Sequence, residues 1–248
     1  MRSLRAVLVL AILVGCGSGE DATPPAASTA TTIDPASAGT IDVTVRYTGT
    51  VPPPREVNMR STPACAAAHS GPVYDPSVVA RGGHLASAVV WISKGLEGRT
   101  FAPPSQPIVM DQRGCLYVPH VAAAMVGQPV EFRNSDSEAH NVHGKPGQAT
   151  QWNFIMSRQG GSRTITVDEP EVAIPVGCDI HPWMQAYLAV IAHPFFAVTG
   201  EGGTVRLQGI PAGTYVVSSW HERLGTKEQP VTVEPKAIGS VQIRYDGA

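Results

Sequence analysis

The chain is dominated by short runs in which apolar and polar residues alternate, and turns rich in Gly or Pro separate these runs. The run from Ile41 to Tyr47 places an apolar side chain at every second position, which is the period of a strand with one buried face. Similar short runs follow at 88–92, 130–132, 164–167, 172–176, 187–191, 205–207, 215–219, 231–233 and 241–245. Only the segment 63–69 suits a short helical turn. We therefore expect an all-β protein built from sandwiches or barrels.

Composition narrows the class of protein further. The 248 residues include 25 Gly and 22 Pro, and only 15% are charged, which excludes a coiled coil and a charge-rich disordered chain. The formal net charge is −2, and the chain has no stripe of Lys and Arg that could neutralise nucleic-acid phosphates. We therefore expect no nucleic-acid partner. The length allows one large β domain or two ordinary ones.

The first residues have the pattern of an export signal. Arg2 and Arg5 precede an apolar run at Ala6–Val14 that is too short to span a bilayer. The end of this run leads into Leu-Val-Gly-Cys at 13–16, which is similar to the lipobox of bacterial lipoproteins. This predicts a signal peptide at 1–15 and lipidation of Cys16. The alternative is an ordinary secretory peptide in which Cys16 is incidental.

The next segment, 16–38, consists mostly of Ala, Thr, Ser, Pro and Gly. This composition favours a flexible tether. With a lipidated N-terminus, it predicts an exported protein anchored to the cell envelope on the periplasmic side. Gly17, rather than Asp, follows the cysteine, a pattern that resembles lipoproteins sent to the outer membrane of Gram-negative cells.

The residues with the most informative chemistry lie between 140 and 184. Cys178, His181 and Met184 follow one another at intervals of three, so one loop can direct a thiol, an imidazole and a thioether at one point. His140 supplies a second imidazole from another predicted loop. Two His, one Cys and one weak Met form the ligand set of a trigonal type 1 copper site. A buried Cys and Met are also common core residues, but the conjunction of all four favours a metal.

Several motifs around these residues resemble the cupredoxins, in particular those of the amicyanin and plastocyanin type. The resemblance rests on Cys-x-x-His-Pro-x-Met at 178–184, His-Asn-Val-His at 140–143, and the segments 117–119, 126–132 and 134–136. It covers residues 106–194 and implies a Greek-key β-sandwich that holds one type 1 copper. By the same resemblance, the copper ligands are His140, Cys178, His181 and Met184.

The resemblance also implies roles for residues around the ligands. Asn141 would link the two ligand loops by hydrogen bonds and direct its backbone N–H at the Cys178 sulfur. Pro182 has no N–H to donate to that sulfur, which would raise the reduction potential. His143 lies three residues after His140, on the opposite face if the segment is extended. We predict that His143 is structural or exposed.

These features predict an electron carrier rather than an enzyme, because catalytic multicopper sites need further clustered His and the chain has no His-x-His pair. The resemblance implies that the exposed edge of His181 docks redox partners such as a c-type cytochrome or a dehydrogenase. Trp183 and the apolar stretch 121–125 are predicted to share this docking face; the alternative is that Trp183 is buried. His120 is predicted to lie near the centre or to face a partner. The competing functions are copper binding for delivery, and a structural envelope lipoprotein with a vestigial site.

Two further cysteines remain once Cys16 is lipidated and Cys178 belongs to the ligand set. In an exported protein, two such thiols, here Cys65 and Cys115, usually form a disulfide. The alternative is a second metal site formed by four residues, Cys65, His69, Cys115 and His120.

The segments 39–105 and 195–248 lie outside the cupredoxin resemblance. The C-terminal segment resembles the transthyretin-like domain of carboxypeptidase regulatory segments, which normally begins with strands like those at 39–47 and 88–92. We therefore predict that the two segments together form a prealbumin-like β-sandwich into which the cupredoxin is inserted. The alternative is two domains in series, with 39–194 as an extended cupredoxin.

Overall fold

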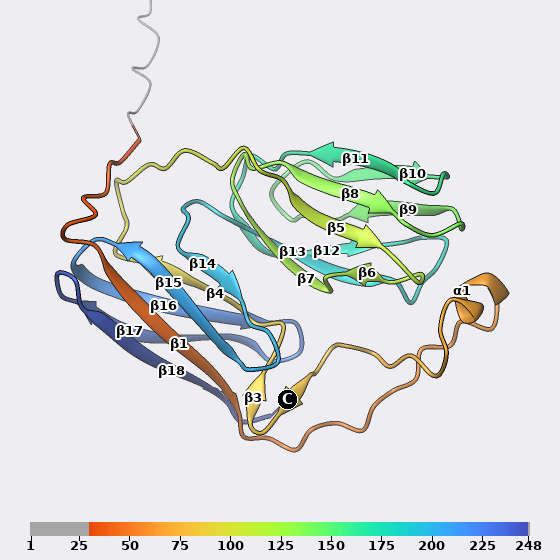
Figure 1. The fold of residues 1–248 in the computed structure, drawn as a ribbon, viewed down its shortest axis with the longest axis horizontal. Helices are drawn as coiled ribbons and strands as arrows, with labels where there is room; N and C mark the ends of the chain where they lie inside the picture. The colour runs from red at the N-terminus through yellow and green to blue at the C-terminus, as the bar shows by residue number, and fades with distance from the viewer. Residues whose placement is uncertain (1–29, 248) are drawn as a thin grey trace, which may run out of the picture.

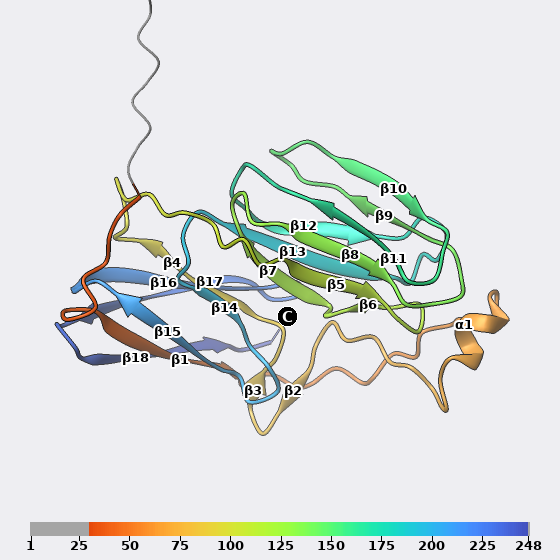
Figure 2. The ribbon, with the colours of Figure 1, turned by 45° about the horizontal axis from the view of Figure 1, so that its top comes forward.

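The computed structural model describes residues 30–247, and it confirms the predicted all-β class (Figure 1). These residues form 18 strands and one helix of five residues, α1 (Pro63–Ala67). The strands belong to four sheets, which pair into two sandwiches that lie side by side (Figure 1, Figure 2). The predicted signal peptide and Cys16 lie outside the described residues.

The first sandwich is built from residues 108–191. One of its sheets has the order β10-β9-β12-β13-β7, from β7 (Val121–Met125), β9 (His140–Gly144), β10 (Trp152–Met156), β12 (Glu171–Gly177) and β13 (Gln185–Ile191). The other has the order β11-β8-β5-β6, from β5 (Ile108–Gln112), β6 (Tyr117–Val118), β8 (Val130–Asn134) and β11 (Gly161–Ile165). Both sheets contain a parallel pair, β7 with β13 and β5 with β8, so the chain crosses between sheets as well as forming hairpins. Phe132, Val142 and Leu188 are completely buried in the core of this sandwich.

The second sandwich is built from the segments on either side of the first. One sheet contains β1 (Gly39–Tyr47), β2 (Ala80–Arg81), β3 (His84–Leu85), β15 (Thr204–Ile210) and β18 (Ile238–Tyr245). The other has the order β14-β4-β16-β17, from β4 (Val89–Lys94), β14 (Phe196–Val198), β16 (Gly213–His221) and β17 (Gly225–Val233). Within the first sheet, β1 pairs with β15 on one side and β18 on the other, so that Val43 lies opposite Val205 and Val241. The N-terminal strand is therefore held by strands that follow the first sandwich in the chain.

Strand β7 belongs to the first sandwich and also contacts the second, and all five of its residues are buried. Ala122 and Ala124 belong to the core of the first sandwich. Val121 and Ala123 face the other way, into an apolar cluster that includes Val89 of β4 in the second sandwich. The prediction that the stretch 121–125 forms part of a docking surface is therefore wrong, because alternate residues of one strand are buried on opposite faces of the sheet.

A long excursion between β1 and β2 leaves the second sandwich and reaches the first (Figure 1, Figure 2). We call residues 55–75 of this excursion the strap. The outgoing and returning halves of the strap are joined by a hydrogen bond from the Val57 N–H to the Val73 carbonyl at 2.8 Å. Met59 and Cys65 are buried in the core of the first sandwich. This part of the segment 39–105 therefore contributes to the first core, because the strap's apolar side chains cover that sandwich.

The described part of the predicted tether, residues 30–38, contacts the second sandwich. The Thr31 N–H donates to the Thr100 carbonyl at 2.6 Å. Ile33 packs against the core of the second sandwich. Among residues 30–247, no helix is long and apolar enough to cross a bilayer.

Burial of His221 at the end of β16 predicts acid sensitivity. Burial, followed by the charge of His120, lowers the pKa of His221 from 6.5 to about 4. Between these values the unfolded chain binds a proton that the folded chain does not. His221 therefore favours folding above pH 6.5, and as the pH falls to 4 we expect the free energy of unfolding to fall by roughly 3 kcal/mol.

Urea unfolding at pH 7.5 and pH 4.5 measures this effect. The His221→Gln variant should lose less stability than the parent protein between the two pH values, whatever its absolute stability. An equal loss in parent and variant would show that other groups cause the acid sensitivity.

Candidate metal centre

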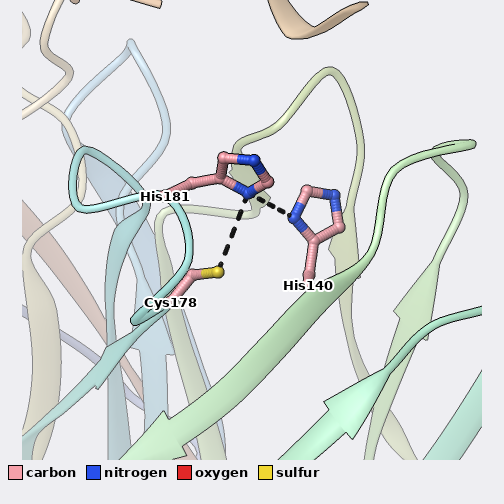
Figure 3. A group of neighbouring side chains, drawn as sticks. All are labelled: His140, Cys178 and His181. Carbon is pink, nitrogen blue, oxygen red and sulfur yellow. Dashed lines mark hydrogen bonds between the residues drawn. The ribbon is translucent and has the colours of Figure 1, made fainter. Parts of the chain in front are cut away.

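Three of the four predicted ligands, His140, Cys178 and His181, meet at one end of the first sandwich. His140 is the first residue of β9, and the others lie in or beside the loop that joins β12 to β13. Two backbone hydrogen bonds close this loop: the Cys178 N–H donates to the Met184 carbonyl at 3.1 Å, and the Met184 N–H donates to the His181 carbonyl at 2.9 Å. Figure 3 shows that the loop brings Cys178 and His181 toward His140.

Three donor atoms converge in this centre (Figure 3). The Nδ1 atoms of His140 and His181 are 3.0 Å apart, and the Cys178 Sγ lies 3.9 Å from the His181 Nδ1. One nitrogen from each imidazole and the sulfur all lie within 4.8 Å of one another. All three residues are at most 3% exposed. Two nitrogens and one sulfur aimed at one buried point can bind a transition-metal ion.

Asp136 orients His140 from outside the centre. Its carboxylate oxygen lies 3.0 Å from the His140 Nε2, so the other ring nitrogen, Nδ1, is left to face the donors. The same carboxylate accepts the N–H groups of Gly114 at 2.6 Å and Cys115 at 2.8 Å. A carboxylate on the outer nitrogen of a metal-binding His is a common device for fixing the tautomer. The sequence motif contained Asp136 without indicating this role, although a carboxylate four residues before His140 was the available signal.

The protonation of the metal-free centre follows from these contacts. Burial alone would lower the pKa of His140, but the hydrogen bonds with Asp136 and Cys178 raise it to about 9. Burial alone would raise the pKa of Cys178, but the bonds from His140 and from backbone N–H groups lower it below its ordinary value. The centre is therefore set up to hold a thiolate, the form of Cys that binds metals.

Asn141 joins the two ligand segments. β9 and β12 are antiparallel neighbours with His143 opposite Gly177, and this pairing places Asn141 beside Asp179. The Asp179 N–H donates to the Asn141 side chain at 2.6 Å, and the Asn141 amide donates back to the Asp179 carboxylate at 2.9 Å. A backbone hydrogen bond from Asn141 also lowers the Cys178 pKa, which is the arrangement that the resemblance implied.

The remaining motif residues have distinct positions. Met184 is completely buried in the same core as Cys178. Pro182 is exposed, and its carbonyl accepts a hydrogen bond from the Gln185 side chain. His143 bonds to the Asp179 carboxylate at 2.9 Å, and it does not belong to the group of converging donors.

Cys65 and Cys115 form a disulfide, as predicted, with their Cα atoms 5.5 Å apart. The alternative of a second metal site at these residues is wrong, because both sulfurs are committed to the bond. His69 instead bonds to the Gly114 carbonyl at 2.7 Å. His120 pairs with Glu222 of the second sandwich.

The prediction that His181 presents an exposed edge is also wrong. His181 is only 3% exposed, because the Cys65 Sγ of the strap lies 3.8 Å from its outward-facing Nε2. Trp183 is partly buried, donates its indole N–H to the Cys115 carbonyl at 3.1 Å, and lies with its ring centroid 5.1 Å from that of His181. Neither position was readable from the sequence, since the strap comes from a distant segment.

No protein-family model matches this chain, and no curated protein sequence matches it. Solved structures of copper proteins are similar to part of it. A copper-containing nitrite reductase from Thermus scotoductus SA-01 is 23% identical, with 41% of this chain and 25% of that chain covered and a TM-score of 0.31. An oxidised amicyanin variant is 24% identical over 34% of this chain and 81% of its own, also with a TM-score of 0.31.

A purple cupredoxin from Nitrosopumilus maritimus is 21% identical over 34% of this chain and 97% of its own, with a TM-score of 0.29. This chain thus spans only a quarter of the nitrite reductase, whereas it spans most of the two smaller proteins. The donor atoms themselves, rather than these similarities, indicate a metal centre.

Proposed function

We propose that this chain is a type 1 copper protein that carries single electrons. His140, Cys178 and His181 are the main ligands in this proposal, and Met184 is a weaker fourth. The observation that carries the proposal is the convergence of two imidazole nitrogens and one cysteine sulfur in a buried site. Copper, when bound by such a set, supplies a Cu(II)/Cu(I) couple.

The residues present fit copper in donor type, tautomer and charge. Imidazole nitrogen accepts both oxidation states of copper, and thiolate sulfur favours Cu(I). Asp136 holds the outer nitrogen of His140, so the inner nitrogen is directed at the metal position. The lowered Cys178 pKa favours the thiolate.

The chain's own structure supports electron transfer over copper delivery. A delivery protein must release its metal to a partner, which requires ligands that solvent or a partner can reach. Here the three converging residues are buried, and the loop that carries two of them is closed by backbone hydrogen bonds. A rigid buried centre resists ligand exchange and needs little rearrangement when an electron arrives or leaves.

Location and partners complete the proposal. The pattern of residues 1–16 supports export and lipid anchoring at Cys16 on the periplasmic side of the envelope. The cupredoxin-like motifs support redox proteins as partners, such as a c-type cytochrome or a dehydrogenase. We expect no catalysis by this chain alone.

A copper titration tests the proposed function. One equivalent of Cu(II) added to the metal-free protein should produce an intense visible charge-transfer band from the thiolate, and the bound copper should be reducible and reoxidisable without loss. Absorption spectra and metal analysis after gel filtration measure both results. A colourless copper complex, or no bound copper, would contradict the proposal.

Replacing Met184 should change the reduction potential more than the colour. In Met184→Leu the weak thioether donor is lost while the two His and the Cys remain, so we expect a retained visible band and a higher potential. Spectroelectrochemical titration measures the potential. Met156→Leu is the matched control, since Met156 is a buried methionine of the same core. An equal shift in both variants would argue against Met184 as a ligand.

A further inference from the structure

We propose that the Cys65–Cys115 disulfide is a lock on the metal centre, which closes after the metal has bound and then prevents its exchange. This inference deepens the proposed function: the part that concerns metal exchange rests on copper binding at this centre. It concerns the strap, which comes from a segment outside the sandwich that holds the donors.

The disulfide covers the outward face of His181. The Nδ1 of His181 faces the other donors, whereas its Nε2 lies 3.8 Å from the Cys65 Sγ. Cys65 is completely buried, and Cys115 is 1% exposed. The Cys65 sulfur therefore covers the side of the imidazole that faces away from the other donors.

The loop around Cys115 connects the lock to the other ligands. Its Cys115 N–H and Gly114 N–H donate to Asp136, which also holds His140. Trp183, which lies between His181 and Met184 in the ligand loop, donates to the Cys115 carbonyl. A single covalent bond from the strap to this loop thus restrains both ligand segments.

Apart from the disulfide, the strap is held by the packing of Met59, Val57 and Val73 against the first core and by weaker polar contacts. Its helix α1 has only five residues, and the N-cap residue Thr62 makes no capping hydrogen bond through its side chain, so the helix is not stable by itself. The Arg55–Asp75 ion pair at the base is largely exposed on the Arg side and contributes little. At the tip, His69 bonds to the Gly114 carbonyl, and a Cβ on Gly114 would lie 2.8 Å from the His69 ring.

The closing step balances as a thiol–disulfide exchange. The Cys65 and Cys115 thiols form one S–S bond and lose two electrons and two protons. The oxidant is a disulfide of a partner or small molecule, whose S–S bond breaks and takes up the two electrons and two protons to give two thiols. Once closed, the bond is buried and hard for a reductant to reach, which suits a lock better than a reversible switch.

The first test needs no metal. In a Cys16→Ser background, Cys178 is the only free thiol of the disulfide-bonded chain. We expect iodoacetamide to modify Cys178 at least about tenfold faster in the Cys65→Ser/Cys115→Ser variant, because reagents reach buried thiols through local opening. Arg55→Ala is the control, since it removes a largely exposed ion pair of the strap that contributes little to stability, and it should leave the rate unchanged. Equal rates with and without the disulfide would overturn the lock.

The second test uses the unsubstituted cysteines and so remains informative if the double variant fails to fold. The protein is prepared in its dithiol form, and half is then oxidised with a small-molecule disulfide. The oxidised sample should take up Co(II) at least about tenfold more slowly than the dithiol sample. It should also lose bound Co(II) to excess chelator at least about tenfold more slowly. Equal rates would overturn the lock. If neither sample binds Co(II) or Cu(II), the proposed function fails. The rates at which iodoacetamide modifies Cys178 in the first test still decide whether the strap closes the site.

Discussion

Cys178→Ser is expected to abolish the visible band of the copper-loaded protein and most of its copper affinity. In the proposed site the band would arise from charge transfer between the thiolate and Cu(II), and a serine hydroxyl supplies neither the sulfur nor, at neutral pH, the negative charge. The pKa of Cys178 is lowered by His140 and by backbone N–H groups, so the local structure is arranged around a thiolate that the variant lacks. Visible absorption and a competition titration with a chelator measure the two losses.

His143→Gln is the matched control for this prediction. His143 lies near the centre, but its ring nitrogen bonds to Asp179 and it is absent from the converging donors. The control variant should keep the band and the affinity. A Cys178→Ser protein that retains an intense band, or a His143→Gln protein that loses it, would show that the ligand assignment is wrong.

Asp136→Ala is expected to weaken copper binding by about 10- to 100-fold. The carboxylate holds the Nε2 of His140 at 3.0 Å, and without it the imidazole can rotate or present the wrong tautomer. The same change releases the N–H groups of Gly114 and Cys115. In the metal-free protein the pKa of His140, held at about 9 partly by Asp136, should fall.

Two measurements separate a positioning role for Asp136 from a general loss of stability. A chelator competition gives the affinity, and NMR titration of the imidazole gives the His140 pKa in the metal-free protein. Asp136→Asn, which keeps an acceptor oxygen but not the charge, should show a smaller affinity loss. Glu138→Gln removes a nearby charge that acts on the pKa of His181 but not on that of His140, and it should leave the His140 pKa unchanged. An unchanged affinity in Asp136→Ala would contradict the role.

The sequence was sufficient for features that depend on local spacing. Alternating apolar residues such as those of β1 predicted strands, because the two faces of a strand are filled by alternate residues. Cys178, His181 and Met184 lie in one short loop, so their spacing alone predicted that two of the converging donors come from one segment. The Cys65–Cys115 disulfide followed from counting thiols in a chain predicted to be exported, and the structure contains it.

Only the tertiary structure decided what covers the centre. The apolar residues of β7 gave no sign of whether they faced a partner or another part of the same chain, because exposed and buried apolar strands have the same pattern. The roles of Asp136 and of the strap depend on contacts between distant segments, such as Cys65 with His181, which are 116 residues apart. Such contacts are set by how the two sandwiches pack and where the strap crosses between them, and no local spacing encodes that geometry. The sequence therefore determined which residues could bind a metal, whereas the packing determined that the centre is closed.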